Sequence, residues 1–236
     1  MIRSSFLRTL ALASVFVIGL SASATAGTRI NLRVEGAKAT LYDGSISVIG
    51  GKLTSRIGED RGSHSCNVAD NGGRGVPAVT PTRALFEASA QTLRDRLGPL
   101  RLEWYESFSD FIVGSIGDEA PSGNSYWELS VNWKVAQVGG CAIALKDGDE
   151  VLWAVSDGAT PSLRLLAPKT ARRGRQFNVR VTDGATGKGV AGAHVGGETT
   201  GAGGIAKLTL RTGTKRLLRA TKTGSTRSST EAIELR

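Results

Sequence analysis

The first half of the chain contains several short stretches in which apolar and polar residues alternate. Ile30, Leu32 and Val34 alternate with polar neighbours, the period of a strand with one face in a core and one in water. The same reasoning predicts further strands at 45–49, 126–131, 135–138 and 150–155. These strands belong to one folded unit that precedes residue 157.

One segment has the period of a helix. Thr80 and Pro81 suit its start, because threonine can cap the first turn and proline lacks an N–H that would go unpaired there. Apolar residues follow at helical spacing at Phe86, Ala90, Leu93 and Leu97. One helix among several strands predicts an α+β domain, with the helix packed on one face of a mixed sheet.

After residue 162 the pattern consists of short strands only. Candidate strands lie at 163–168, 176–183, 191–197, 204–210, 215–222 and 231–235. Turn residues separate them about every ten positions, as in a small antiparallel β-sandwich of immunoglobulin-like type. We therefore predict two domains, 28–156 and 162–236, joined by a short linker.

The first 26 residues have the features of an export signal. Arg3 and Arg8 precede an apolar run over 10–20, and small residues lead to a cleavage site after Ala26. The apolar run is too short for a permanent membrane span. We expect a mature chain without a transmembrane anchor that is secreted or extracytoplasmic, either free or associated with the cell surface.

Export makes the two cysteines informative, because disulfides form in oxidising compartments. A disulfide between Cys66 and Cys141 is the favoured interpretation. It would tie down the long polar segment from Arg56 to Val79, which is otherwise long for a connection without secondary structure. The alternative is a reactive thiol, with Cys66 paired with His64.

Charge divides the chain into two unequal parts. Residues 27–160 hold 13 Lys/Arg and 17 Asp/Glu, a net charge of −4, whereas 161–236 hold 15 and 4, a net charge of +11. Arg172, Arg173 and Arg175 form a basic loop cluster that serves either solubility or contact with an anionic cell-envelope polymer. Nucleic acid is not expected as a partner of an exported chain, and no aromatic residue accompanies this cluster.

The stretch from Tyr126 to Cys141, preceded by HSC, a helix and FIVGSIGDE and followed by LKDGDEVLW, resembles a family of secreted bacterial proteins. Their domain of unknown function is similar to the C-terminal domain of transcobalamin and intrinsic factor. The resemblance covers residues 28–155 and implies a β-grasp-like fold and pairing of the two cysteines. It makes a corrinoid conceivable as a ligand, although the helical domain that completes the cobalamin site in those relatives is absent here.

Residues 162–236 resemble the carboxypeptidase-regulatory-like or immunoglobulin-like sandwiches that often follow such domains, through GVAGAHV and the later TGAGG turn.

The candidate ligand-binding residues are Trp127, Asn132 and Trp133. Indole rings stack on flat ligands, but tryptophans in strands more often pack in a core, and this is the favoured interpretation for Trp127. Trp133 replaces a glycine that the bacterial family commonly has after Val-Asn. A tryptophan fits that turn only if its backbone avoids positive φ, so we expect the turn to differ from its relatives.

No set of catalytic residues or metal ligands is predicted from the sequence, since its two histidines and two cysteines lack a zinc spacing. We expect a non-enzymatic protein without a cofactor that binds a small molecule or glycan through its first domain. The alternative is a structural or adhesive envelope protein with no small ligand. A hydrolase is the third hypothesis.

Overall fold

The computed structural model describes residues 27–58, 60–73, 78–91 and 97–236. The predicted signal peptide at 1–26 lies outside these residues, as do residues 59 and 74–77 of the 56–79 segment and residues 92–96 of the predicted helical pattern. Within the described part, the chain is mostly β, with one α-helix and several sheets. That part contains no helix long and apolar enough to cross a membrane.

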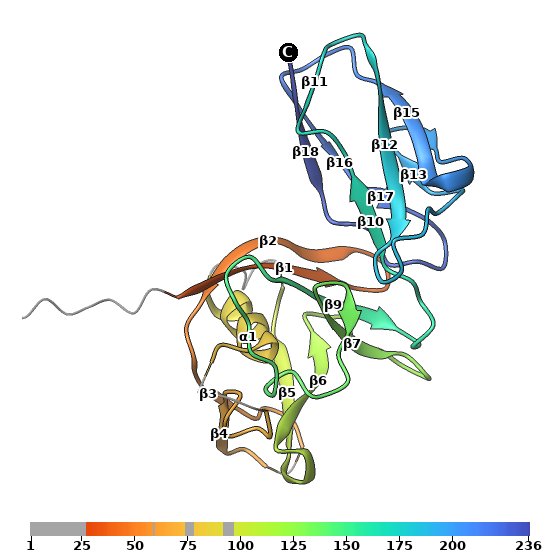
Figure 1. The fold of residues 1–236 in the computed structure, drawn as a ribbon. Coiled ribbons are helices and arrows are strands. Elements are labelled where there is room, and N and C mark those ends of the chain that lie inside the picture. Colours follow the sequence, from red (N-terminus) through yellow and green to blue (C-terminus); the bar gives the residue numbers. More distant parts are fainter. Residues whose placement is uncertain (1–26, 59, 74–77, 92–96) are drawn as a thin grey trace, which may run out of the picture.

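The first module, residues 27–156, is built on a five-stranded mixed sheet (Figure 1). Its strands are β1 (Thr28–Glu35), β2 (Thr40–Val48), β7 (Tyr126–Val131), β8 (Lys134–Val135) and β9 (Glu150–Ser156). They are arranged in the order β2-β1-β9-β7-β8. The central pair, β1 and β9, is parallel, and the other neighbours are antiparallel. Ile30, Leu32 and Val34 face the core as the alternation predicts.

Helix α1 (Pro81–Gln91) packs against the inner face of this sheet. Thr80 caps it as predicted, because its hydroxyl accepts a hydrogen bond from the N–H of Arg83 (3.3 Å) and its carbonyl accepts one from Ala84 (2.9 Å). Ala84, Leu85 and Ala88 are fully buried in the same cluster as the inner side chains of β1. Leu93 falls outside the described residues.

Two strand pairs complete the first module. They are β3 (Gly51–Thr54) with β4 (Ser63–Cys66), and β5 (Leu100–Tyr105) with β6 (Asp110–Ile116), joined by the short 3-10 helix η1 (Glu106–Phe108). The predicted disulfide links Cys66, at the end of β4, to Cys141. It closes a loop of 75 residues, a constraint that the chain-entropy model values at about 4–5 kcal/mol.

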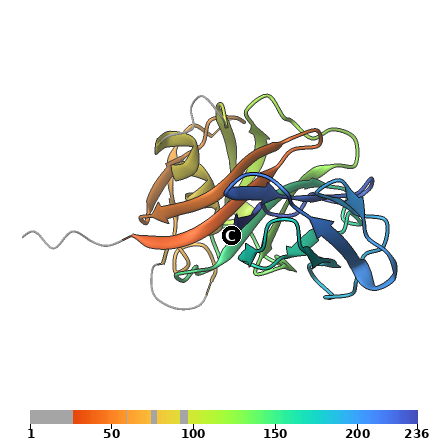
Figure 2. The same cartoon turned by 90° about the horizontal axis from the view of Figure 1, so that it is seen from above.

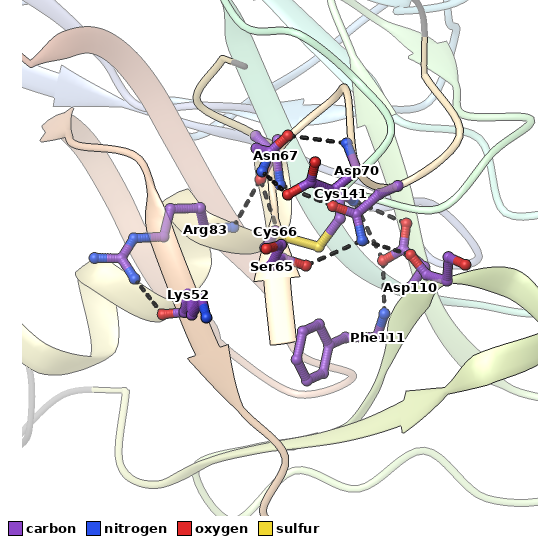
Figure 3. The surroundings of a disulfide bond; sticks show 12 residues. Lys52, Ser65, Cys66, Asn67, Asp70, Arg83, Asp110, Phe111 and Cys141 are labelled. Carbon is purple, nitrogen blue, oxygen red and sulfur yellow. Dashed lines mark hydrogen bonds between the residues drawn. A yellow bond between two sulfur atoms is a disulfide. The ribbon is translucent and has the colours of Figure 1, made fainter. Parts of the chain in front are cut away.

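The disulfide lies beside the buried carboxylate of Asp110 (Figure 3). This carboxylate accepts hydrogen bonds from the backbone N–H groups of Phe111 (2.6 Å) and Cys141 (2.9 Å). With both cysteines oxidised, the alternative of a reactive Cys66 thiol is wrong. The His64 ring instead stacks on Trp104, with centroids 4.1 Å apart.

The second module, residues 162–236, is all β. Its strands are β10 (Leu163–Leu166), β11 (Thr170–Ala171), β12 (Gln176–Asp183), β13 (His194–Val195), β14 (Glu198–Thr199), β15 (Ile205–Thr209), β16 (Lys215–Leu218), β17 (Ala220–Thr221) and β18 (Glu231–Leu235), with a 3-10 turn η2 (Ala202–Gly204). Three small sheets enclose one apolar core that shares no residue with the core of the first module.

The second module stands on the outer face of the first module's sheet, opposite α1 (Figure 1). Seen from above in Figure 2, the N-terminal end of β1 (red-orange) extends clear of the second module (blue). The two modules therefore meet over part of the sheet only, and the polar side chains of that face lie where they meet.

Candidate functional site

The outer face of the sheet is polar because of the alternation in β1. Ile30, Leu32 and Val34 point to the core, so Arg33 and Glu35 point the other way. Both are nevertheless buried, Arg33 at 6% exposure and Glu35 at 1%. Contacts from the second module account for this burial, which a strand with one wet face does not predict.

Glu35 is the centre of an ion-pair network between the modules. Its carboxylate lies 2.8 Å from the Nε of Arg227 and 3.7 Å from Arg219, and it accepts a hydrogen bond from the Thr40 hydroxyl. Arg219 also pairs with Asp43 at 2.5 Å. Burial raises the pKa of Glu35 in spite of the surrounding cations. Several charged hydrogen bonds thus fix the second module on the first.

Next to this network lies a cavity of about 660 Å³ between the two modules. The sheet contributes Asn31, Arg33, Asp43, Ser45, Glu128, Ser130, Glu150 and Leu152, and the linker contributes 158–162. The second module contributes Lys169, Asp183, Thr186 and 229–232. The cavity therefore exists only where both modules are in place.

The cavity walls are acidic although the chain is basic. Five carboxylate side chains line it, those of Asp43, Glu128, Glu150, Asp183 and Glu231, against the cationic side chains of Arg33 and Lys169. Two of the carboxylates have ion-pair partners, since Asp43 pairs with Arg219 and Glu231 with Lys169. The remaining acidic groups, those of Glu128, Glu150 and Asp183, give this partly open space a net negative charge that favours a ligand with positive charge.

Trp133 forms part of the cavity wall. The guanidinium carbons of Arg33 and Arg164 each lie 5.4 Å from the centroid of its ring, one from each module. Gly184 packs so closely on the indole that a Cβ there would overlap its ring carbons. Trp133, one of the three candidate ligand-binding residues, thus joins the two modules and borders the cavity.

The expectation that Trp133 avoids positive φ is wrong. Its φ is +68° and that of Asn132 is +51°, so the two residues form the turn between β7 and β8 with both backbones in the left-handed region. Two-residue hairpins favour this geometry, and glycine usually occupies the second position. The contacts of the ring with Arg33 and Arg164 offset the strain of a bulky residue there.

The other two candidate ligand residues do not line the cavity. Asn132 is used locally, since its side-chain amide donates to Asp149 (2.9 Å) and its oxygen accepts from the N–H of Glu150 (3.0 Å). Trp127 is 7% exposed within the core of the first module, as favoured from the sequence. Neither is among the residues that line the cavity.

The basic cluster at Arg172, Arg173 and Arg175 is exposed in the loop between β11 and β12. Figure 1 places this loop at the end of the second module that is distant from the first. Within the described residues, no group of three or more His, Cys, Asp or Glu side chains is arranged to hold a metal ion.

The carboxylates of the cavity were not predicted as site residues. Glu128 and Glu150 lie on strands that the sequence predicted, and the alternation places both side chains on the outer face of the sheet. A list of the charged residues on the outer face of the predicted sheet would have identified Glu128 and Glu150. Nothing in the local sequence indicates that the second module covers this face.

Comparisons with known proteins give a partial match. Residues 102–157, from β5 to the end of β9, match the model of a family described as a domain of unknown function, DUF4430. No curated protein matches the chain. One solved structure, of fibronectin(III)-like modules of Clostridium thermocellum CbhA, is 13% identical, covers 52% of this chain and 71% of that chain, and has a TM-score of 0.24. A TM-score of 0.24 is too low to indicate a shared fold.

Proposed function

We propose that this protein is an exported, non-enzymatic binding protein that holds a small polar ligand between its two modules. The first module is β-grasp-like and similar to the C-terminal domain of transcobalamin. Three features support the β-grasp-like assignment: the β1–β2 hairpin at the start of the module, the single helix α1 and the central parallel pair of β1 and β9. The second module is an immunoglobulin-like sandwich, an assignment supported by its all-β composition and single core.

The observation that carries the proposal is the 660 Å³ cavity with its acidic walls. Its size falls in the range of small-molecule sites, which are concave and carry a few polar groups that orient the ligand. Ser45, Ser130 and Asn31 supply hydrogen-bonding groups on the sheet side. Glu128 and Glu150 add negative charge to the same wall.

This combination fits a ligand that carries both hydroxyl and ammonium groups, such as a glycan built from amino sugars. Hydroxyl groups satisfy the serine and asparagine side chains, and an ammonium group compensates the carboxylates. A neutral sugar of the same shape would leave those carboxylates without a cation. The proposal therefore predicts discrimination by charge between otherwise similar sugars.

The test is calorimetric titration of the mature protein with glucosamine oligomers and with their N-acetylated, uncharged counterparts at about pH 6. We expect the glucosamine oligomers to bind at least about tenfold more tightly than the acetylated ones. Ser45→Trp, which fills the cavity from β2, should abolish binding. Ser47→Trp is the matched control, because Ser47 is exposed on the same strand and does not line the cavity.

Two outcomes would contradict the proposal. Equal binding by the two Trp variants would place the ligand outside the cavity. Absence of binding by both sugars would reject the amino-glycan, and a corrinoid titrated in the same series would then test the ligand that the transcobalamin resemblance implies. Binding of neither class would favour a structural envelope protein.

A further inference from the structure

A second surface, independent of the cavity, lies at the distal end of the second module. The loop 172–175 is held against two other segments there. The N–H of Arg173 donates to the carbonyl of Arg236 (2.9 Å), and that of Gly174 donates to Leu210 (2.8 Å). The Arg173 guanidinium also reaches the carbonyl of Gly213 (3.5 Å). Segments more than thirty residues apart in sequence therefore meet at this end.

Strand pairing adds further cations to the same place. β18 pairs with β11 on one side and with β16 on the other, and Thr214 accepts a hydrogen bond from Leu235 (2.8 Å). Lys215 and Arg216, at the start of β16, thus lie beside the loop. We call the seven exposed cations of these segments the basic tip; they are Arg172, Arg173, Arg175, Arg211, Lys215, Arg216 and Arg236.

The basic tip contains little compensating negative charge. Glu234, opposite Lys215, is the single acidic residue in 170–176, 210–216 and 232–236. Within the described part of the chain, none of the seven cations forms an ion pair. At the other end of the same module, Arg219 and Arg227 are neutralised by the first module. The excess positive charge is therefore concentrated at the end that points away from it.

We infer that the basic tip is a docking surface for an anionic polysaccharide. Arginine forks bind carboxylate, sulfate and phosphate groups in pairs of hydrogen bonds, and several adjacent cations suit a repeating anionic chain. The seven residues come from three segments, so the surface is wider than the three arginines that form the basic loop cluster in the sequence.

Two other anionic partners fit less well. Single-stranded nucleic acids need aromatic side chains on which bases stack, and the only aromatic residue near the tip, Phe177, is partly buried against the core. Membrane surfaces favour several apolar side chains beside the cations. Here Leu217 is the one large exposed apolar residue of 210–218.

The test measures binding of the full mature chain to polygalacturonate, a carboxylated glycan, by biolayer interferometry at 20 and 300 mM salt. We expect at least about tenfold weaker binding at the higher salt, since screening weakens contacts between exposed charges. The variant R172Q/R173Q/R175Q should bind at least about tenfold more weakly than the wild type at low salt. Its matched control, K188Q/K207Q/K222Q, removes the same charge from exposed positions elsewhere on the module and should lose less than about threefold.

Equal losses in the two triple variants would overturn the inference, because binding would then follow net charge alone. Tighter binding to a single-stranded oligonucleotide or to anionic phospholipid vesicles than to polygalacturonate would also overturn it. Far-ultraviolet circular dichroism of both variants verifies that they are folded. Since neither variant touches the cavity, titration with glucosamine oligomers separates a failure here from a failure of the proposed function.

Discussion

Trp133 combines an unfavourable backbone with favourable ring contacts. A φ of +68° is natural for glycine and costs an L-residue about 1 kcal/mol or more. The hairpin itself was evident from Val-Asn before the residue and from the strand that precedes it. The positive φ of Trp133 could not be predicted from the sequence, because the groups that stabilise it, Arg164 and Gly184, lie in the other module.

This balance gives a prediction at the residue scale. Trp133→Ala and Trp133→Gly both remove the ring contacts with Arg33 and Arg164, but only glycine also relieves the backbone strain. We expect the glycine variant to be more stable than the alanine variant by about 1 kcal/mol. Urea unfolding of the two variants and the wild type measures the difference. An alanine variant as stable as the glycine variant would show that the turn is not strained.

At the scale of the element, the regular strands and the helix cap were predictable and the irregular pieces were not. β2 begins at Thr40, earlier than the alternation predicted, because it pairs with β1 along the whole length of that strand. A register shift between Val34 and Glu35 interrupts the regular pairing near this end. β8 is shorter than the predicted 135–138, since only two residues pair with β7 before the chain leaves the sheet toward Cys141. The disulfide was predictable from the expected export signal and an even cysteine count.

Asp110 links β6 to the segment that carries Cys141, and its titration should affect stability. Burial raises its pKa to about 6 from 3.8, which outweighs the opposing effect of the N–H groups of Phe111, Cys141 and Ala142. The folded state therefore binds more protons than the unfolded chain between about pH 4 and 6. In that window this group lowers the free energy of unfolding by about 2 kcal/mol as the pH rises, out of about 3 kcal/mol over its complete titration.

The substitution Asp110→Asn removes this titration. We expect the stability of the variant, relative to wild type, to rise by about 2 kcal/mol from pH 4 to pH 6.5, whatever its absolute stability. Denaturant unfolding of both proteins at several pH values in this window provides the comparison. Parallel pH profiles would mean that Asp110 has an ordinary pKa in the folded protein.

At the scale of the molecule, two modules were predicted from the change of pattern and charge near residue 160, but their association was not. Arg33 and Glu35 occupy the polar positions of an alternating strand, which from sequence alone are expected to face water. Their partners, Arg219 and Arg227, lie in a basic segment that the sequence associated with an external polyanion. Part of that charge is instead used within the molecule.

The interface network should determine how firmly the modules are coupled. Arg227→Gln leaves the buried carboxylate of Glu35 without its nearest cation and removes the hydrogen bond to the carbonyl of Gly36. Breaking one partner of a buried pair typically costs about 3–5 kcal/mol. We expect a lower melting temperature and separate calorimetric transitions for the two modules. Lys188→Gln is the control, and identical thermograms for both variants would contradict a coupling role.

The parallel pairing of β1 with β9 also constrains how the first module can be made. The N–H of Arg29 bonds to Asp147, 118 residues later, and the rest of the strand depends on Glu150–Ser156 for its partner. During synthesis one edge of β1 must stay open until almost the whole module has left the ribosome. Such distant pairing slows folding and leaves an unpaired edge available for association with other chains.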